Sequence, residues 1–141
     1  MNTSLTPFRP GDQVADDAEL LELATFLAGG THPRRRTLTV TWLDAEDRLL
    51  GLALPVDDVP ARPDPAALAG LGTVLRSVVE DEAPGGCAVL VLERPGDATV
   101  TADDRAWNRG LRAEADGRGV RLRGFFVAAG GQVRPLALDD A

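Results

Sequence analysis

Residues 87–92 read Cys87-Ala88-Val89-Leu90-Val91-Leu92, six apolar side chains without a break. A continuous apolar run of this length is typical of a strand that is covered on both faces, in the middle of a sheet. Pro84, Gly85 and Gly86 end the segment before it, and Pro95 with Gly96 begins a polar loop after it. This run therefore predicts a central strand with helices packed against the sheet.

Working outward toward the N-terminus, residues 37–43 alternate between apolar and threonine side chains. The apolar face carries Leu38, Val40 and Trp42, and the other face carries Thr37, Thr39 and Thr41. Strict alternation predicts a strand with one buried and one open face. Residues 44–47 predict a turn into a second strand over about 49–54, and the Asp- and Pro-rich stretch 55–65 predicts a loop.

Three segments have the apolar spacing and the end signals of helices. The first follows Asp16 and ends at Gly29-Gly30, with Leu20, Leu23, Ala24 and Leu27 at helical spacing. The second opens at Asp64-Pro65, where Asp is a favoured N-cap and Pro a favoured first helical residue. The third covers about 102–116.

Strands over 119–127 and about 132–137, joined by a turn at Gly130-Gly131, complete the expected order α-β-β-α-β-α-β-β. This order predicts an α/β (α+β) fold, a single three-layer domain with a mixed central sheet and flanking helices. We expect residues 1–14 to be an irregular arm and residues 15–141 to be the domain.

The composition excludes several kinds of mechanism. The chain has 141 residues, and its 15 cationic residues are all arginine, with no lysine and a single histidine, His32. Without lysine there is no Schiff base and no P-loop phosphate clamp, and one histidine rules out a multi-histidine metal centre. The formal net charge of −7 disfavours non-specific binding to nucleic acid, which needs a basic surface.

The single cysteine, Cys87, permits no internal disulfide, which fits a reducing compartment. Residues 1–12 lack the apolar core of a signal peptide, and no apolar run approaches the length of a membrane span. These features predict a cytoplasmic protein without a membrane segment. We expect Cys87 to be buried in the core, and Trp42 and Trp107 to be core or interface anchors.

The loop after the central strand contains Pro95-Gly96-Asp97, and Thr101 and Asp104 then open the third helix. Together with residues 43–50 and 119–127, this segment resembles the RadC-like branch of the JAB/MPN metalloprotease superfamily. In that family an apolar strand runs into His-x-His-Pro-Ser-Gly-Asp, and Pro-Ser-x-x-Asp opens the next helix. The resemblance covers roughly residues 36–137 and implies a JAB/MPN-like (cytidine-deaminase-like) fold.

The chain departs from the family pattern at the metal site. In the family two histidines and one aspartate hold zinc, and an upstream glutamate takes a proton from the bound water. The histidine pair would fall on Leu92 and Arg94 or, shifted by one residue, on Val91 and Glu93. The glutamate would fall near Ala53, where the chain has no carboxylate.

The resemblance therefore implies a degenerate, non-catalytic member without a metal or other cofactor, which acts as a protein-interaction or structural module. A protein partner or a homo-oligomer is the expected assembly. Arg94, Thr101 and Asp104 are then degenerate family positions. Thr101 and Asp104 have a second interpretation as a helix capping box, in which each residue binds the backbone of the other.

Two further hypotheses belong to other classes of protein. A hydrolase could have a rebuilt divalent-metal site that uses Glu93, Asp97, Asp104 and His32. A nucleic-acid-associated protein is suggested by the arginines in the second half of the chain. Among these, Arg105, Arg109 and Arg112 form a stripe at i, i+4 and i+7 of the third helix, either an ordinary solvated face or a partner-binding surface.

Overall fold

The central strand β3 (Cys87–Glu93) lies in the middle of a five-stranded mixed sheet with the order β2-β1-β3-β4-β5. This is seen in a computed structural model, which describes residues 8–29 and 33–137. The chain forms a single α+β domain whose elements follow the predicted order. The other strands are β1 (Thr37–Leu43), β2 (Leu49–Asp57), β4 (Arg121–Ala129) and β5 (Gln132–Leu136).

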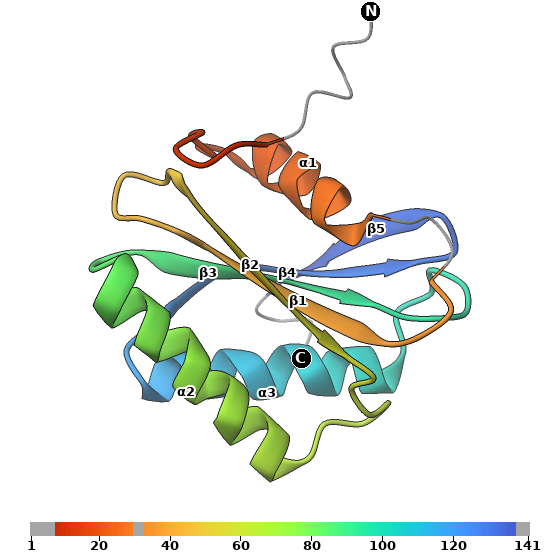
Figure 1. Ribbon diagram of the computed structural model, residues 1–141. Coiled ribbons are helices and arrows are strands. Elements are labelled where there is room, and N and C mark those ends of the chain that lie inside the picture. The colour runs from red at the N-terminus through yellow and green to blue at the C-terminus, as the bar shows by residue number, and fades with distance from the viewer. Residues whose placement is uncertain (1–7, 30–32, 138–141) are drawn as a thin grey trace, which may run out of the picture.

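Helices cover both faces of this sheet (Figure 1). One helix, α1 (Asp17–Ala28), lies on one face, and α2 (Pro65–Glu82) and α3 (Ala102–Gly117) lie side by side on the other. The predicted N-cap of α2 is confirmed, because the side chain of Asp64 accepts from Ala67 N. The structure adds a cap for α1, where the side chain of Asp16 accepts from Glu19 N.

The sheet combines two pairing directions. β1 pairs antiparallel with both β2 and β3, and β4 pairs antiparallel with β5. β3 and β4 are parallel, joined by a crossover through α3 as parallel neighbours require. β3 is buried along almost its whole length, which confirms the prediction of a central strand.

β1 differs from its prediction, because all seven of its residues are buried rather than only one face. The threonine face is covered as well, and the hydroxyl groups of Thr37 and Thr41 have partners inside the sheet. Thr37 Oγ1 donates to Asp57 Oδ1 at 3.0 Å, and Thr41 Oγ1 donates to the Leu52 carbonyl at 2.8 Å. Alternation of apolar and hydroxyl residues therefore did not mark a solvent-facing side.

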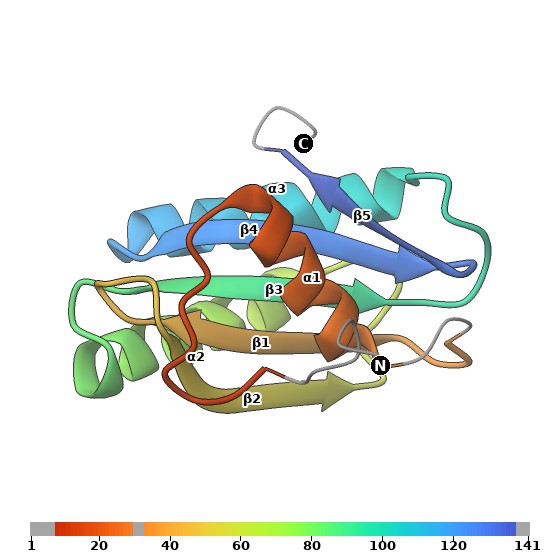
Figure 2. The same cartoon turned by 90° about the horizontal axis from the view of Figure 1, so that it is seen from above.

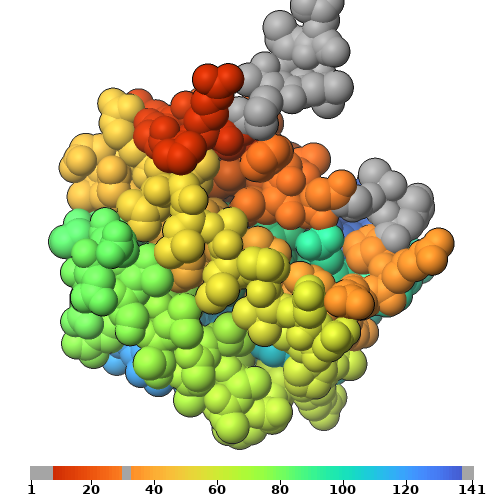
Figure 3. Space-filling model, in the orientation of Figure 1, coloured from red at the N-terminus to blue at the C-terminus, as the bar shows by residue number. Residues whose placement is uncertain are grey.

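β2 is longer than predicted and reaches Asp57, so it includes residues 55–57 at the start of the stretch 55–65 that was expected to be a loop. Pro55 is tolerated because β2 is an edge strand, where one missing backbone N–H need not break a ladder. Much of β2 is exposed, and its yellow residues run across the face of the molecule that Figure 3 shows.

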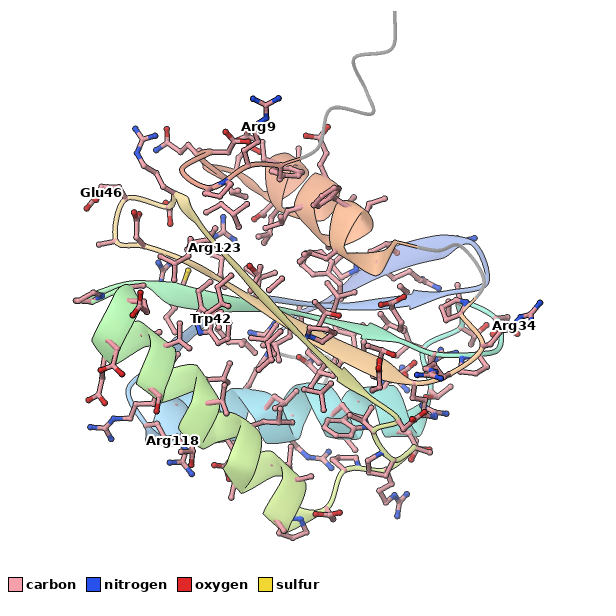
Figure 4. The ribbon with its side chains drawn as sticks, in the orientation of Figure 1. Arg9, Arg34, Trp42, Glu46, Arg118 and Arg123 are labelled. Atoms are coloured by element: carbon pink, nitrogen blue, oxygen red, sulfur yellow. The ribbon has the colours of Figure 1, made fainter. Side chains whose placement is uncertain are left out.

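Two buried clusters form the core, one on each face of the sheet. The cluster under α2 and α3 contains Trp42, Leu90, Trp107, Leu111 and Phe125. The cluster under α1 contains Leu20, Leu23, Val89, Val91 and Phe126. Trp42 lies on the α2 side of the sheet (Figure 4), and both tryptophans are fully buried, as predicted.

Within the described ranges, no helix has the length and apolar character needed to cross a membrane.

Candidate functional site

Arg94, Thr101 and Asp104, the residues that the resemblance singled out, meet at the carboxyl end of β3. Arg94 directly follows this strand, and Asp104 lies in the first turn of α3. Both side chains are buried, with 4% of the Arg94 side chain and 0% of the Asp104 side chain exposed. A charged pair so completely removed from water needs nearly full hydrogen bonding to be stable.

Arg94 meets this requirement with all of its guanidinium nitrogens. Nε and Nη2 each donate to Asp104, to Oδ1 and Oδ2 respectively, at 2.8 Å. Nη1 donates to the carbonyl groups of Pro95 at 3.1 Å and Asp97 at 2.9 Å. Nη2 also donates to the Thr99 carbonyl at 2.8 Å. Five contacts match the five N–H groups that a guanidinium carries.

Asp104 is held from the helix side by a capping box. Its Oδ2 accepts from Thr101 N at 2.9 Å, and Asp104 N donates to Thr101 Oγ1 at 3.0 Å. The capping-box prediction for this pair is confirmed. Oδ2 therefore has two donors and Oδ1 has one, all of them from the protein.

The electrostatics of the pair keep both groups charged. Burial alone would raise the pKa of Asp104, but the hydrogen bonds from Arg94 and Thr101 outweigh it, so the pKa of this carboxyl lies below its usual value. The hydrogen bond to Asp104 raises the pKa of Arg94 in turn.

The loop after β3 folds around the guanidinium. Gly96 has φ of +100°, a conformation that side chains other than glycine rarely adopt, and it allows carbonyls on both sides of it to converge on Arg94. The side chain of Asp97 accepts from Thr99 N at 2.9 Å, and this bond helps to hold the pKa of Asp97 below its usual value. The arrangement fixes a loop conformation around a buried positive charge.

The predicted arginine stripe on α3 divides into two parts. Arg105 and Arg109 are exposed, and neither guanidinium has a hydrogen bond or ion pair to another described residue. Arg112 is half-buried and donates to Asn108 Oδ1 at 2.8 Å and to the Leu136 carbonyl at 2.9 Å. Arg112 thus ties α3 to the end of β5 instead of extending a free stripe.

The described carboxylates of the rebuilt-metal-site hypothesis are not brought together. Glu93 lies on the α1 face of the sheet because β3 alternates, whereas Asp104 lies on the α3 face. Burial and the nearby Asp57 raise the pKa of Glu93. Across residues 8–29 and 33–137, no three His, Cys, Asp or Glu side chains are grouped so as to hold a metal ion. His32 lies outside the described residues.

Sequence reasoning missed Asn108, which is fully buried and donates from Nδ2 to the Ala137 carbonyl at 2.9 Å. Its position one residue after Trp107, on the buried side of α3, was the available signal. Cys87 is buried as predicted, and this burial raises the pKa of its thiol.

No protein-family model matches this chain, and no curated protein is significantly similar to it.

Proposed function

We propose that this chain is a non-catalytic domain related to the RadC-like branch of the JAB/MPN superfamily, and that it acts as a protein-interaction or structural module in the cytoplasm. The observation that carries the proposal is the Arg94–Asp104 pair. In the resembling family, these positions belong to a metal ligand set. In this chain they form an ion pair whose polar groups all have protein partners.

The direction of the side chains supports one of the two possible alignments. Leu90 and Leu92 belong to the cluster under α3, so the next residue on that face, Arg94, points toward Asp104. Val91 and Glu93 point to the opposite face. Only the alignment that places the histidine pair on Leu92 and Arg94 would bring it to the side of the sheet that holds Asp104.

The upstream position supports the loss of catalysis in the same way. Leu54 pairs with Val40 of the α3-side cluster, so Leu52 and Leu54 are the residues of 52–55 that share this face. The side chains of Leu52 and Leu54 cannot accept a proton from a water molecule. In the resembling family, the glutamate has this role.

The first test is the metal content and activity of the purified wild-type chain. We expect sub-stoichiometric zinc by elemental analysis and no divalent-ion-dependent activity in a screen of peptidase and phosphatase substrates. Stoichiometric zinc that disappears in Asp104→Ala would overturn the proposal. A metal-dependent activity that disappears in Glu93→Ala would instead support a hydrolase with a rebuilt site.

The second test rebuilds the family pattern. In Leu92→His/Arg94→His, two imidazoles would share the face of Asp104, and we expect this variant to gain stoichiometric zinc that is lost when Asp104→Ala is added. The matched control is Val91→His/Glu93→His, which carries the same pair on the opposite face and should bind none. Equal zinc binding by both variants would contradict the proposed relationship.

A further inference from the structure

The loop between β2 and α2, residues 58–64, meets the first half of α3 at one end of the sheet. β2 and β3 run in the same direction, because each pairs antiparallel with β1, so both end where α3 begins (Figure 2). Nε1 of Trp107 in α3 donates to the carbonyl groups of Pro60 at 3.2 Å and Ala61 at 3.0 Å. Since Trp107 is fully buried, these bonds hold the loop in a fixed position against the helix.

A surface hollow of about 430 Å³ lies between this loop and α3. Three arginines and three small apolar residues line it, and these are Arg62, Arg105, Arg109, Pro63, Ala102 and Ala106. The four that belong to α3 are spaced by three and four residues, so they share one face of the helix. The alanines leave space at the surface of the helix, and the hollow has arginines on its loop side and on its helix side.

The charge of this hollow is opposite to that of the whole chain, which carries −7. Arg62 has an ion pair with Asp103 at 3.5 Å. Arg105 and Arg109 form no ion pair within the part of the chain that the structure describes. Two like charges four residues apart on a helix repel each other. A bound anion would remove this repulsion, and the protein itself supplies no group at the hollow that does so for both arginines.

We propose that this hollow is a binding site for a phosphate monoester, a role that goes beyond the interaction module proposed above. Guanidinium groups bind phosphate through pairs of parallel N–H groups, which lysine cannot do. A monoester carries about 1.5 to 2 negative charges at pH 7 and three strong acceptor oxygens, which matches a hollow with three arginines.

The size and the lining of the hollow define the rest of the ligand. Its volume is within the range of small-ligand pockets, so it has room for an organic group beside the phosphate. Among the described residues that line it, none is aromatic, so it offers no surface on which a nucleotide base would stack. We therefore expect a monoester of a non-aromatic group, such as a sugar or a serine side chain.

The first probe is inorganic phosphate, titrated into the full-length chain labelled with nitrogen-15 at constant ionic strength. We expect saturable shifts of the backbone amide signals of Arg62 and of residues 102–109, because these segments line the hollow. Acetate, which carries a single charge, should bind at least several-fold more weakly. Arg105→Gln/Arg109→Gln should weaken phosphate binding by about tenfold or more, since two charge-assisted contacts are lost.

A matched control separates the hollow from the overall charge. Arg9→Gln/Arg76→Gln makes the same change in net charge at two exposed arginines outside the hollow, and Arg9 lies on the α1 side of the sheet (Figure 4). This variant should bind phosphate with wild-type affinity. All four substitutions are at exposed positions, so the amide spectra of both variants should keep the dispersion of the folded chain.

Two further probes distinguish the sources of a monoester, which are a free metabolite and a phosphorylated side chain of a partner protein. A hexose phosphate represents the first source, and a short phosphoserine peptide represents the second. Tighter binding of either probe than of inorganic phosphate supports the site and identifies its source. No gain in affinity for either probe would show that the hollow does not accept a monoester.

Three other results would overturn the site. These are no saturable shift at Arg62 and residues 102–109, equal weakening of phosphate binding in both double variants, or tighter binding of a single-stranded DNA than of both monoester probes. The last result would favour a nucleic-acid-associated protein instead. Zinc content and hydrolysis are measured separately, so a failure of this site leaves the non-catalytic role standing.

Discussion

The guanidinium of Arg94 and the carboxylate of Asp104 meet side by side in the interior, with two nitrogen–oxygen distances of 2.8 Å. The geometry is bidentate, which fixes the direction of approach as well as the distance. The pair joins the end of β3 to the beginning of α3 and so closes the loop between them. Replacing one residue of the pair, or both, is the most direct test of what the pair contributes to stability.

Arg94→Met should destabilise the domain by about 3 to 5 kcal/mol, because it leaves the buried Asp104 without its counter-charge. Urea unfolding followed by circular dichroism measures this loss. Adding Asp104→Leu to Arg94→Met should recover part of the stability, since the stranded carboxylate is then gone. The control is Arg105→Met, because Arg105 is an exposed arginine that follows Asp104 in α3. This variant should change the free energy of unfolding by less than about 0.5 kcal/mol.

Stability should also depend on pH through Asp104. The pKa of this carboxyl is lowered in the folded chain, so on acidification the unfolded chain takes up the proton first. The stabilisation is therefore present above the ordinary aspartate pKa of about 4 and is lost as the pH falls through the lower folded value. The stability difference between wild type and Asp104→Asn should be large at pH 7 and should shrink below about pH 4. A difference that stays constant with pH would contradict the charged pair.

Glu93 should behave in the opposite sense. Burial raises its pKa, so the folded chain binds the proton first and stability falls as the pH rises through this range. Glu93→Gln should therefore be more stable relative to wild type at pH 7 than at pH 4, as measured by thermal unfolding at both values. Asp57 is the neighbour that adds to the shift, and Asp57→Asn should reduce the pH dependence at Glu93.

Gly86 should tolerate no side chain. A Cβ at this position would collide with the carbonyl oxygens of Leu43 and Ala83, which belong to the backbone and cannot swing aside. Gly86→Ala should cost about 1 to 3 kcal/mol, the usual range for overpacking a tight site. Gly117→Ala is the control, because nothing lies within 4 Å of its Cβ position at the end of α3. Equal stability of the two variants in urea would show that the site near Gly86 can relax.

The sequence predicted the order and kind of all eight elements, because caps and periodicity are local signals. The N-caps Asp64 and Thr101 were readable for the same reason, since each acts within its own first turn. The two strand errors came from tertiary context. Threonines of β1 are buried by packing across the sheet, and the length of β2 depends on its being an edge strand.

The candidate site was predictable only in part. The capping box of Thr101 and Asp104 follows from sequence spacing, but the partner of Asp104 comes from a different element. Arg94 faces Asp104 and Glu93 faces away because alternate residues of β3 point to opposite faces of the sheet. The sequence does not show which residues point to which face, since both faces of β3 are apolar. Arg112 could not be distinguished from Arg105 and Arg109 in the sequence, because its contact with Leu136 joins α3 to a distant strand.

The sheet order has a kinetic consequence. β1 with β2, and β4 with β5, are hairpins of neighbouring chain segments, whereas β3 pairs only with β1 across α2 and with β4 across α3. Hairpins close quickly, and pairings between distant segments form late because a long loop must be closed first. Folding of this chain should thus be limited by the insertion of its most apolar strand between two preformed hairpins. Until that step is complete, residues 87–92 are the segment most exposed to aggregation.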